Sequence, residues 1–112
     1  MSDMNYIGAI VKVLETPKKK FINSKTLVVT FKAQLPQTRK NRIVKLVCWG
    51  NLAQSVTKHY NVNDYILIEG YVSFRENKNL SKKNKSFKKV IITALKVYPF
   101  FLNSKQLTNK LS

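Results

Sequence analysis

Residues 42–60 read RIVKLVCWGNLAQSVTKHY, and the spacing of the apolar side chains changes within this stretch. Up to Trp49 the apolar side chains alternate, as they do in a half-buried strand, and the inward face would carry Val44, Leu46 and Cys48. From Asn51 to Tyr60 the apolar period becomes four residues, which is typical of one stripe on a short helix. The stretch therefore predicts a strand that leads directly into a helix.

The expected helix has suitable residues at both ends. Asn51 is a good N-cap residue, and Gln54 follows it three positions later. Lys58 and His59 fall in the last turn, where positive charge interacts favourably with the helix dipole. We therefore expect the helix to begin at Asn51.

The chain around this stretch has the period of strands. Four further segments alternate in the same way: residues 4–14, 26–35, 65–74 and 87–98. Gly70 lies in the middle of one of them, where a closed sheet would need a bulge or a sharp bend. Polar or proline-containing stretches separate the segments, and we expect loops at 16–20, 36–41 and 76–86.

The order is therefore strand, strand, strand, helix, strand, strand. In about 100 residues this is the order of an OB fold, an all-β, five-stranded Greek-key barrel with one short helix between strands three and four. We expect a single OB-fold domain over residues 1–102 and a short basic tail over residues 103–112.

Composition restricts the function. The 112 residues carry 21 Lys and Arg against 5 Asp and Glu, a formal net charge of +16, and self-repulsion at that charge favours a polyanionic partner such as nucleic acid. The single Cys excludes an intramolecular disulfide, and with the single His it cannot complete a zinc site. We expect no metal, no cofactor, no membrane span and no leader peptide.

The residues also resemble a known family, the bacterial and organellar single-stranded DNA-binding proteins. The similarity is centred on residues 47–54 (VCWGNLAQ), which look like the family's exit from strand three, and continues through residues 68–70 (IEG) on strand four. Asn5 and Pro17 fall at the spacing of the family's first strand and of the Asp-Pro that follows that strand. The length and basicity further resemble the short members of this family that red-algal plastid genomes encode.

The chain departs from the family at several positions. Family members usually stack bases on aromatic residues at positions that match Gln37, Ile43 and Asn77 here, and only Trp49 keeps its aromatic ring. Bacterial members end in an acidic tip that recruits partners, whereas residues 103–112 are basic. The resemblance therefore implies single-strand binding and leaves partner recruitment in doubt.

Binding a single strand without sequence preference requires cations that follow the phosphates and flat rings on which bases stack. Lys45 and Trp49 share a face of the third expected strand, and Lys32 lies on the polar face of the second, which would be its neighbour. Trp49 either stacks on a base or only packs against the helix that follows it.

The expected hairpin between the last two strands is the most basic segment of the chain. With Phe74 at its start, it supplies these candidate nucleic-acid contacts: Arg75, Lys82, Lys83, Lys85, Lys88 and Lys89. Phe74 and Phe87, at the strand ends, either stack on bases or close the barrel. Arg39 and Arg42 belong to a second basic cluster, and residues 18–20 form a third.

Catalytic chemistry finds no support in the sequence. Cys48 alternates with inward residues and is expected to be a small buried side chain, and His59 has no acid or Cys near it. The acidic residues are scattered, so they form no carboxylate pair for two-metal catalysis. We expect a binding protein and not an enzyme.

The resulting hypothesis is a protein that binds single-stranded DNA and protects exposed strands during replication and repair. The alternatives are an RNA-binding OB module and a degenerate OB-fold adaptor subunit. The resemblance implies a dimer or tetramer, and Tyr6, Ile10 and Leu14 would supply an apolar outer face on the first strand. The excess of Lys over Arg, 18 to 3, and the 11 Asn suggest AT-rich coding, and hence a plastid or a bacterial cytoplasm.

Overall fold

The computed structural model describes residues 5–36, 42–77 and 87–100. This part of the chain contains six strands and one helix, which are β1 (Asn5–Val13), β2 (Lys18–Phe21), β3 (Leu27–Leu35), β4 (Arg42–Trp49), α1 (Gly50–His59), β5 (Tyr65–Asn77) and β6 (Phe87–Pro99). Helix α1 lies between β4 and β5, as expected. The expected tail over residues 103–112 lies outside the described residues.

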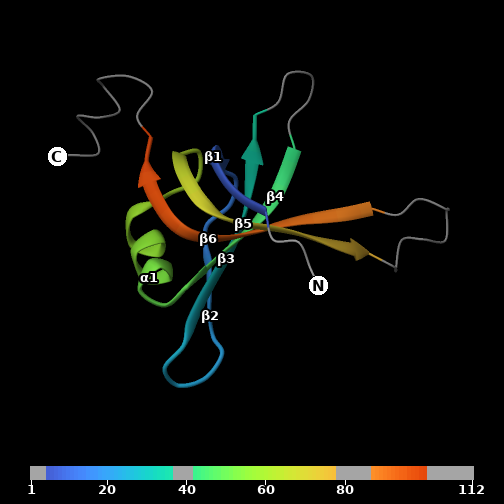
Figure 1. Cartoon of the computed structure of the whole chain (residues 1–112). Helices are drawn as coiled ribbons and strands as arrows, with labels where there is room; N and C mark the ends of the chain where they lie inside the picture. Colours follow the sequence, from blue (N-terminus) through green and yellow to red (C-terminus); the bar gives the residue numbers. More distant parts are fainter. Residues whose placement is uncertain (1–4, 37–41, 78–86, 101–112) are drawn as a thin grey trace.

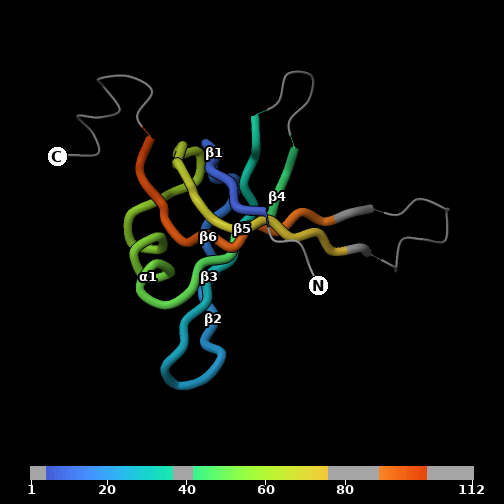
Figure 2. Tube along the Cα trace, in the orientation of Figure 1, coloured from blue at the N-terminus to red at the C-terminus, as the bar shows by residue number. Residues whose placement is uncertain are grey.

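The strands form one sheet in the order β1-β5-β6-β4-β3-β2, and β1 also pairs with β3 to close a barrel. All pairings are antiparallel except β4 with β6. Figure 1 shows α1 beside the barrel, and Figure 2 shows the β2–β3 and β5–β6 hairpins extending from it in different directions. This arrangement confirms the expected all-β OB fold, with one strand more than predicted.

The core lies inside the barrel and under α1. The inward face predicted for β4, with Val44, Leu46 and Cys48, is buried, and the largest fully buried side chains are Phe31, Leu46, Ile66, Ile68 and Ile92. Ala53 and Val56 bury the inner stripe of α1 against this core. Apolar burial of this kind is the main favourable contribution to folding. The side chains on the outer surface contribute less to stability and can serve binding.

Strand β2 is a correction to the sequence analysis, which placed residues 16–20 in a loop. All four residues of β2 are exposed, so no face alternates between polar and apolar and the period gave no signal. The turn that follows is closed by Asn23, whose Oδ1 accepts hydrogen bonds from the backbone N–H groups of Lys25 and Thr26 at 2.8 and 3.0 Å. This turn returns the chain into β3.

The start of α1 also differs from the prediction. The helix begins at Gly50, and its N-cap is Trp49, which makes no side-chain capping hydrogen bond, so the predicted Asn51 cap is wrong. Gly50 has φ +63°, a conformation that glycine adopts at low cost, and this bends the extended chain of β4 into the helix one residue earlier.

Gly70 lies at an irregularity in the barrel, as predicted. Glu69 pairs with Lys96 and Gly70 pairs with Ala94, so Leu95 is an extra residue in β6. A Cβ on Gly70 would lie 2.9 Å from the Ala94 Cα and closer still to the Thr93 carbonyl oxygen, so no side chain fits here. The bulge reverses the alternation in β6: even-numbered residues point inward before it, and Val97 packs against the core after it.

Candidate nucleic-acid interface

Two lysines of neighbouring strands lie opposite each other on the outer surface. Lys32 of β3 is the register partner of Lys45 of β4, as the sequence analysis predicted. Both point away from the core, because Phe31, Ala33, Val44 and Leu46, their neighbours along the strands, are buried. Like charges directly opposite each other on one face destabilise a sheet. A bound anion would remove that cost.

The backbone of Lys32 is fixed by two hydrogen bonds to the residues that follow β1. Its N–H donates to Glu15 Oε2 at 2.9 Å, and its carbonyl accepts from the Leu14 N–H at 2.9 Å. The Glu15 carboxylate thus lies beside the backbone of this pair, and it offsets at most one of the two charges. The cationic pair is therefore held on a rigid part of the barrel.

Trp49 lies on the same face of β4 as Lys45 and is 46% exposed. Its register partner on β3 is Val28, and Val28 in turn pairs with Lys20 of β2. An indole that is nearly half exposed between apolar and cationic neighbours offers one ring face to a base. Packing against α1 alone does not account for this exposure.

The register extends this face across further strands. Next to Trp49 and its partners runs a row with one residue from each strand of the sheet: Lys18, Thr30, Val47, Thr93, Tyr71 and Tyr6. The second row, through Lys32 and Lys45, continues to Ile91 and Ser73. The outer surface of β2, β3, β4 and β6, which we call the sheet face, thus combines cations with small or apolar side chains and Trp49.

The β5–β6 hairpin contributes a second pair of cations. Arg75 and Lys89 are register partners and both are exposed. Phe74 is 58% exposed, so it does not close the barrel, and it projects from the opposite side of the hairpin to Arg75. Lys88 lies in β6, and Arg42 is exposed at the start of β4. The predicted contacts Arg39, Lys82, Lys83 and Lys85 lie outside the described residues.

The matches to the family's aromatic positions can be placed only in part. Ile43 is 59% exposed on the sheet face, two residues before Lys45, so an apolar side chain stands where the family usually has an aromatic ring. Gln37 lies outside the described residues, and Asn77 is the last residue of β5.

Cys48 and His59 occupy the positions that the sequence analysis gave them. Burial raises the pKa of the Cys48 thiol to about 12, so the thiol stays protonated and unreactive near neutral pH. His59 is exposed, and its Nδ1 donates to the Ser55 carbonyl oxygen at 3.0 Å in the last turn of α1. Among the described residues no cluster of His, Cys, Asp or Glu could hold a metal ion. No helix in the described part of the chain is long and apolar enough to cross a membrane.

An apolar surface on the outer side of β1, β5 and β6 adjoins the sheet face, because the row through Val47 and Thr93 continues to Tyr71 and Tyr6. This surface, which we call the tyrosine patch, consists of Tyr6, Ile10, Leu67, Tyr71 and Tyr98. The rings of Tyr6 and Tyr71 meet edge to face at 5.2 Å between centroids, and the Tyr6 hydroxyl donates to Glu69 at 2.9 Å. That hydrogen bond, followed by loss of hydration, raises the pKa of Tyr6.

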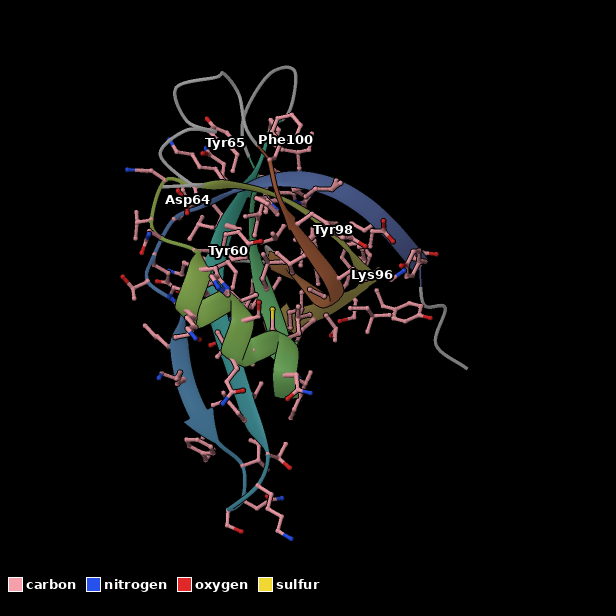
Figure 3. All side chains as sticks on the ribbon, turned by 90° about the vertical axis from the view of Figure 1, so that its left-hand side faces the viewer. Tyr60, Asp64, Tyr65, Lys96, Tyr98 and Phe100 are labelled. Carbon is pink, nitrogen blue, oxygen red and sulfur yellow. The ribbon has the colours of Figure 1, made fainter. Side chains whose placement is uncertain are left out.

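The sequence analysis found only part of the tyrosine patch. It identified Tyr6 and Ile10 but not Leu67, Tyr71 and Tyr98. Figure 3 labels Tyr98 and Lys96 on β6, and both follow the bulge. Their side of the sheet could be assigned from sequence only by placing the extra residue at Leu95, opposite Gly70.

Known proteins resemble this chain in sequence and structure. A protein of Trieres chinensis named "Putative single-stranded DNA-binding protein ycf41" is 37% identical over 109 residues, which cover 94% of this chain and 96% of the relative. The chain belongs to the single-stranded DNA-binding protein family. No protein-family model matches it.

Solved structures agree with the family assignment. The SSB domain of a Synechococcus protein superimposes with a TM-score of 0.67 at 25% identity, covering 88% of this chain and 98% of that domain. The small single-stranded DNA-binding protein of Streptomyces coelicolor gives a TM-score of 0.74 at 15% identity, covering 89% of this chain and 97% of that protein, and supports the fold.

Proposed function

We propose that this protein binds single-stranded DNA without sequence preference on its sheet face. The observation that carries the proposal is the unfavourable Lys32–Lys45 pair on the same face as the half-exposed Trp49. The name of the Trieres chinensis relative supports it independently.

The chemistry of the sheet face suits a strand of any sequence. Lysine ammonium groups neutralise phosphates, which every nucleotide carries, and an indole stacks on any base. Arg75 and Lys89 extend the cationic track along the β5–β6 hairpin. Binding would protect exposed strands during replication and repair, and no catalytic step is part of this role.

Removing the charges of the Lys32–Lys45 pair should weaken the salt dependence of binding and raise the stability of the fold. Changing both residues to Gln should make the slope of log affinity for oligo-dT against log salt shallower by about 1.4, since each phosphate contributes about 0.7. The same change should raise the free energy of unfolding by about 0.2–1 kcal/mol, because the repulsion between the two strands is removed. Salt-dependent anisotropy titrations and urea melts measure the two effects.

The matched control changes Lys12 and Lys25 to Gln, which removes the same charge from outside β3 and β4: Lys12 lies on β1 over the Tyr65 ring, and Lys25 lies in the turn after β2. We expect a smaller change in slope from this control, because its lysines contribute only through the net charge. If the two double variants lost equal affinity, or if the Lys32/Lys45 variant kept the parental slope, the sheet face would not be the binding surface.

The tyrosine patch supports a proposal of self-association. Tyr6 and Tyr98 are 50% and 43% exposed, and apolar side chains gathered on one exposed face often mark a protein–protein contact. A dimer or tetramer formed through this side of β1 would cover the patch and leave the part of the sheet face on β3 and β4, with Lys32, Lys45 and Trp49, open. We expect light scattering to give a mass above 13.0 kDa and Tyr98→Glu to lower it to the monomer mass. A 13.0 kDa species at every concentration would contradict the proposal.

A plastid location is part of the same proposal. It is supported by the match to the Trieres chinensis protein and by the Lys-rich and Asn-rich composition. Detection of the protein in isolated plastids would test it, with a bacterial cytoplasm as the alternative.

A further inference from the structure

A groove lies between the β2–β3 hairpin and α1, on the side of the hairpin that faces the helix. Its volume is about 690 Å³, within the range of roughly 300–1,000 Å³ that is usual for ligand sites. The hairpin lines it with Lys19, Phe21 and Leu27, and the helix with polar side chains that include Asn51, Gln54 and Lys58. Figure 3 shows the hairpin running past the helix.

The groove attracts anions. Two lysines line it and no acidic residue does. The first turn of α1 also contains no acidic residue, and its N-cap makes no side-chain hydrogen bond. The helix dipole therefore adds positive potential at the end where Asn51 lies.

Phe21 is the unusual member of this groove. It is 63% exposed, although a phenylalanine in a strand is normally packed. Lysines on an edge strand often serve to prevent that strand from pairing with a strand of another molecule and aggregating. That explanation covers the lysines of β2, but an exposed phenyl ring beside them favours such aggregation, so the ring needs another role.

Strand β2 connects the groove with the sheet face. It is the last strand of the sheet, and its register places Lys18 and Lys20 on the sheet face, whereas Lys19 and Phe21 face the groove. Trp49, the N-cap of α1, lies in the row of Lys20 and is thus next to both surfaces. A nucleic-acid strand that leaves Trp49 can cross the free edge of β2, where Lys18, Lys19 and Lys20 lie along its path.

We propose that the groove is a second nucleotide site, in which Phe21 stacks on a base and Lys19 and Lys58 hold the adjacent phosphates of a single strand that continues from the sheet face. This inference rests on the proposed function and extends it. A short oligonucleotide occupies the sheet face alone, and a longer one also fills the groove.

The test compares two lengths of oligo-dT on two groove variants, Phe21→Ala and Lys19→Gln with Lys58→Gln. An oligomer of about 8 nucleotides lies within the roughly 4–16 nucleotides that one OB fold covers, and an oligomer of about 24 nucleotides exceeds that range. For the longer oligomer we expect Phe21→Ala to reduce affinity about tenfold, and the double lysine variant to make the salt slope shallower by about 1.4. Both variants should bind the short oligomer with nearly parental affinity and should cover fewer nucleotides at saturation of Trp49 quenching.

Matched controls come from the same hairpin. Ile22→Ala removes an apolar side chain that is also exposed, at 54%, and that does not line the groove, and Lys25→Gln removes a charge from the turn. Both controls should keep the parental ratio of long to short affinity. Circular dichroism checks that every variant is folded.

Three results would overturn the inference. The first is a ratio of long-oligomer to short-oligomer affinity that stays unchanged in both groove variants. The second is a loss of long-oligomer affinity in the controls that equals the loss in the groove variants. The third is that the groove variants no longer bind a poly-glutamate peptide but still cover the parental number of nucleotides. The last would show that the groove takes an acidic peptide. Failure of the parental protein to bind even the short oligomer would instead contradict the proposed function.

Discussion

Affinity for oligo-dT should fall about 300-fold when salt rises from about 50 to about 200 mM. This follows from a footprint of about six phosphate contacts at about 0.7 per phosphate, a log–log slope between about −4 and −5. Phosphate contacts should contribute more to the affinity than stacking does. Positions 37, 43 and 77 carry no aromatic ring, whereas the net charge is +16. Anisotropy of a labelled oligomer over a series of salt concentrations measures the slope.

The hairpin lysines should supply much of this slope. Changing Lys82, Lys83 and Lys85 together to Gln should make it shallower by about 2 units, since each of the three contributes about 0.7. Thermal stability should change little, because the sequence predicts a solvated loop for these lysines and substitutions in such loops have small effects. A parental slope close to zero would contradict the electrostatic account, and an unchanged slope in the triple variant would remove these lysines from it.

Trp49→Ala should weaken oligo-dT binding by about 1–3 kcal/mol, which is about 5- to 150-fold, because one base loses its stacking partner. The salt slope should stay at its parental value, since no phosphate contact is lost. Because the variant has no tryptophan, its affinity is measured by anisotropy of a labelled oligomer.

Trp49→Phe is the conservative control. It keeps an aromatic ring next to Val28 and before α1, so it should recover part of the lost affinity. Equal affinity of the parental protein and a folded Trp49→Ala variant would show that the ring only packs. If Trp49→Ala lowers both the affinity and the melting temperature, the affinity of the Trp49→Phe variant shows whether the lost affinity comes from stacking.

The alternation of apolar residues was sufficient to predict the strands that bury one face. It placed β4 at its observed bounds with the correct inner face, and it located the irregularity at Gly70. Burial produces this signal, so a strand without burial produces none. Strand β2 was missed for that reason, and with it the groove, which needs β2 on one side.

The candidate site was predictable in the part that follows from period and neighbouring strands. Lys32 opposite Lys45, with Trp49 on the same face, needs only two adjacent antiparallel strands in register. The tyrosine patch can be predicted only when the position of the bulge on β6 is known, because one extra residue transfers every later side chain to the other face. The helix start depended on the positive φ of Gly50, a backbone property that residue types alone do not determine.

Titration of Trp49 fluorescence shows whether the sheet face binds single-stranded DNA. Oligo-dT, oligo-rU of equal length and a duplex of equal length are added to the parental protein at the same salt concentration. We expect quenching by oligo-dT that saturates at a defined number of nucleotides per chain, with weaker binding of the oligo-rU and of the duplex. Tighter binding of oligo-rU, equal binding of the duplex, or no saturable quenching by oligo-dT would contradict this expectation.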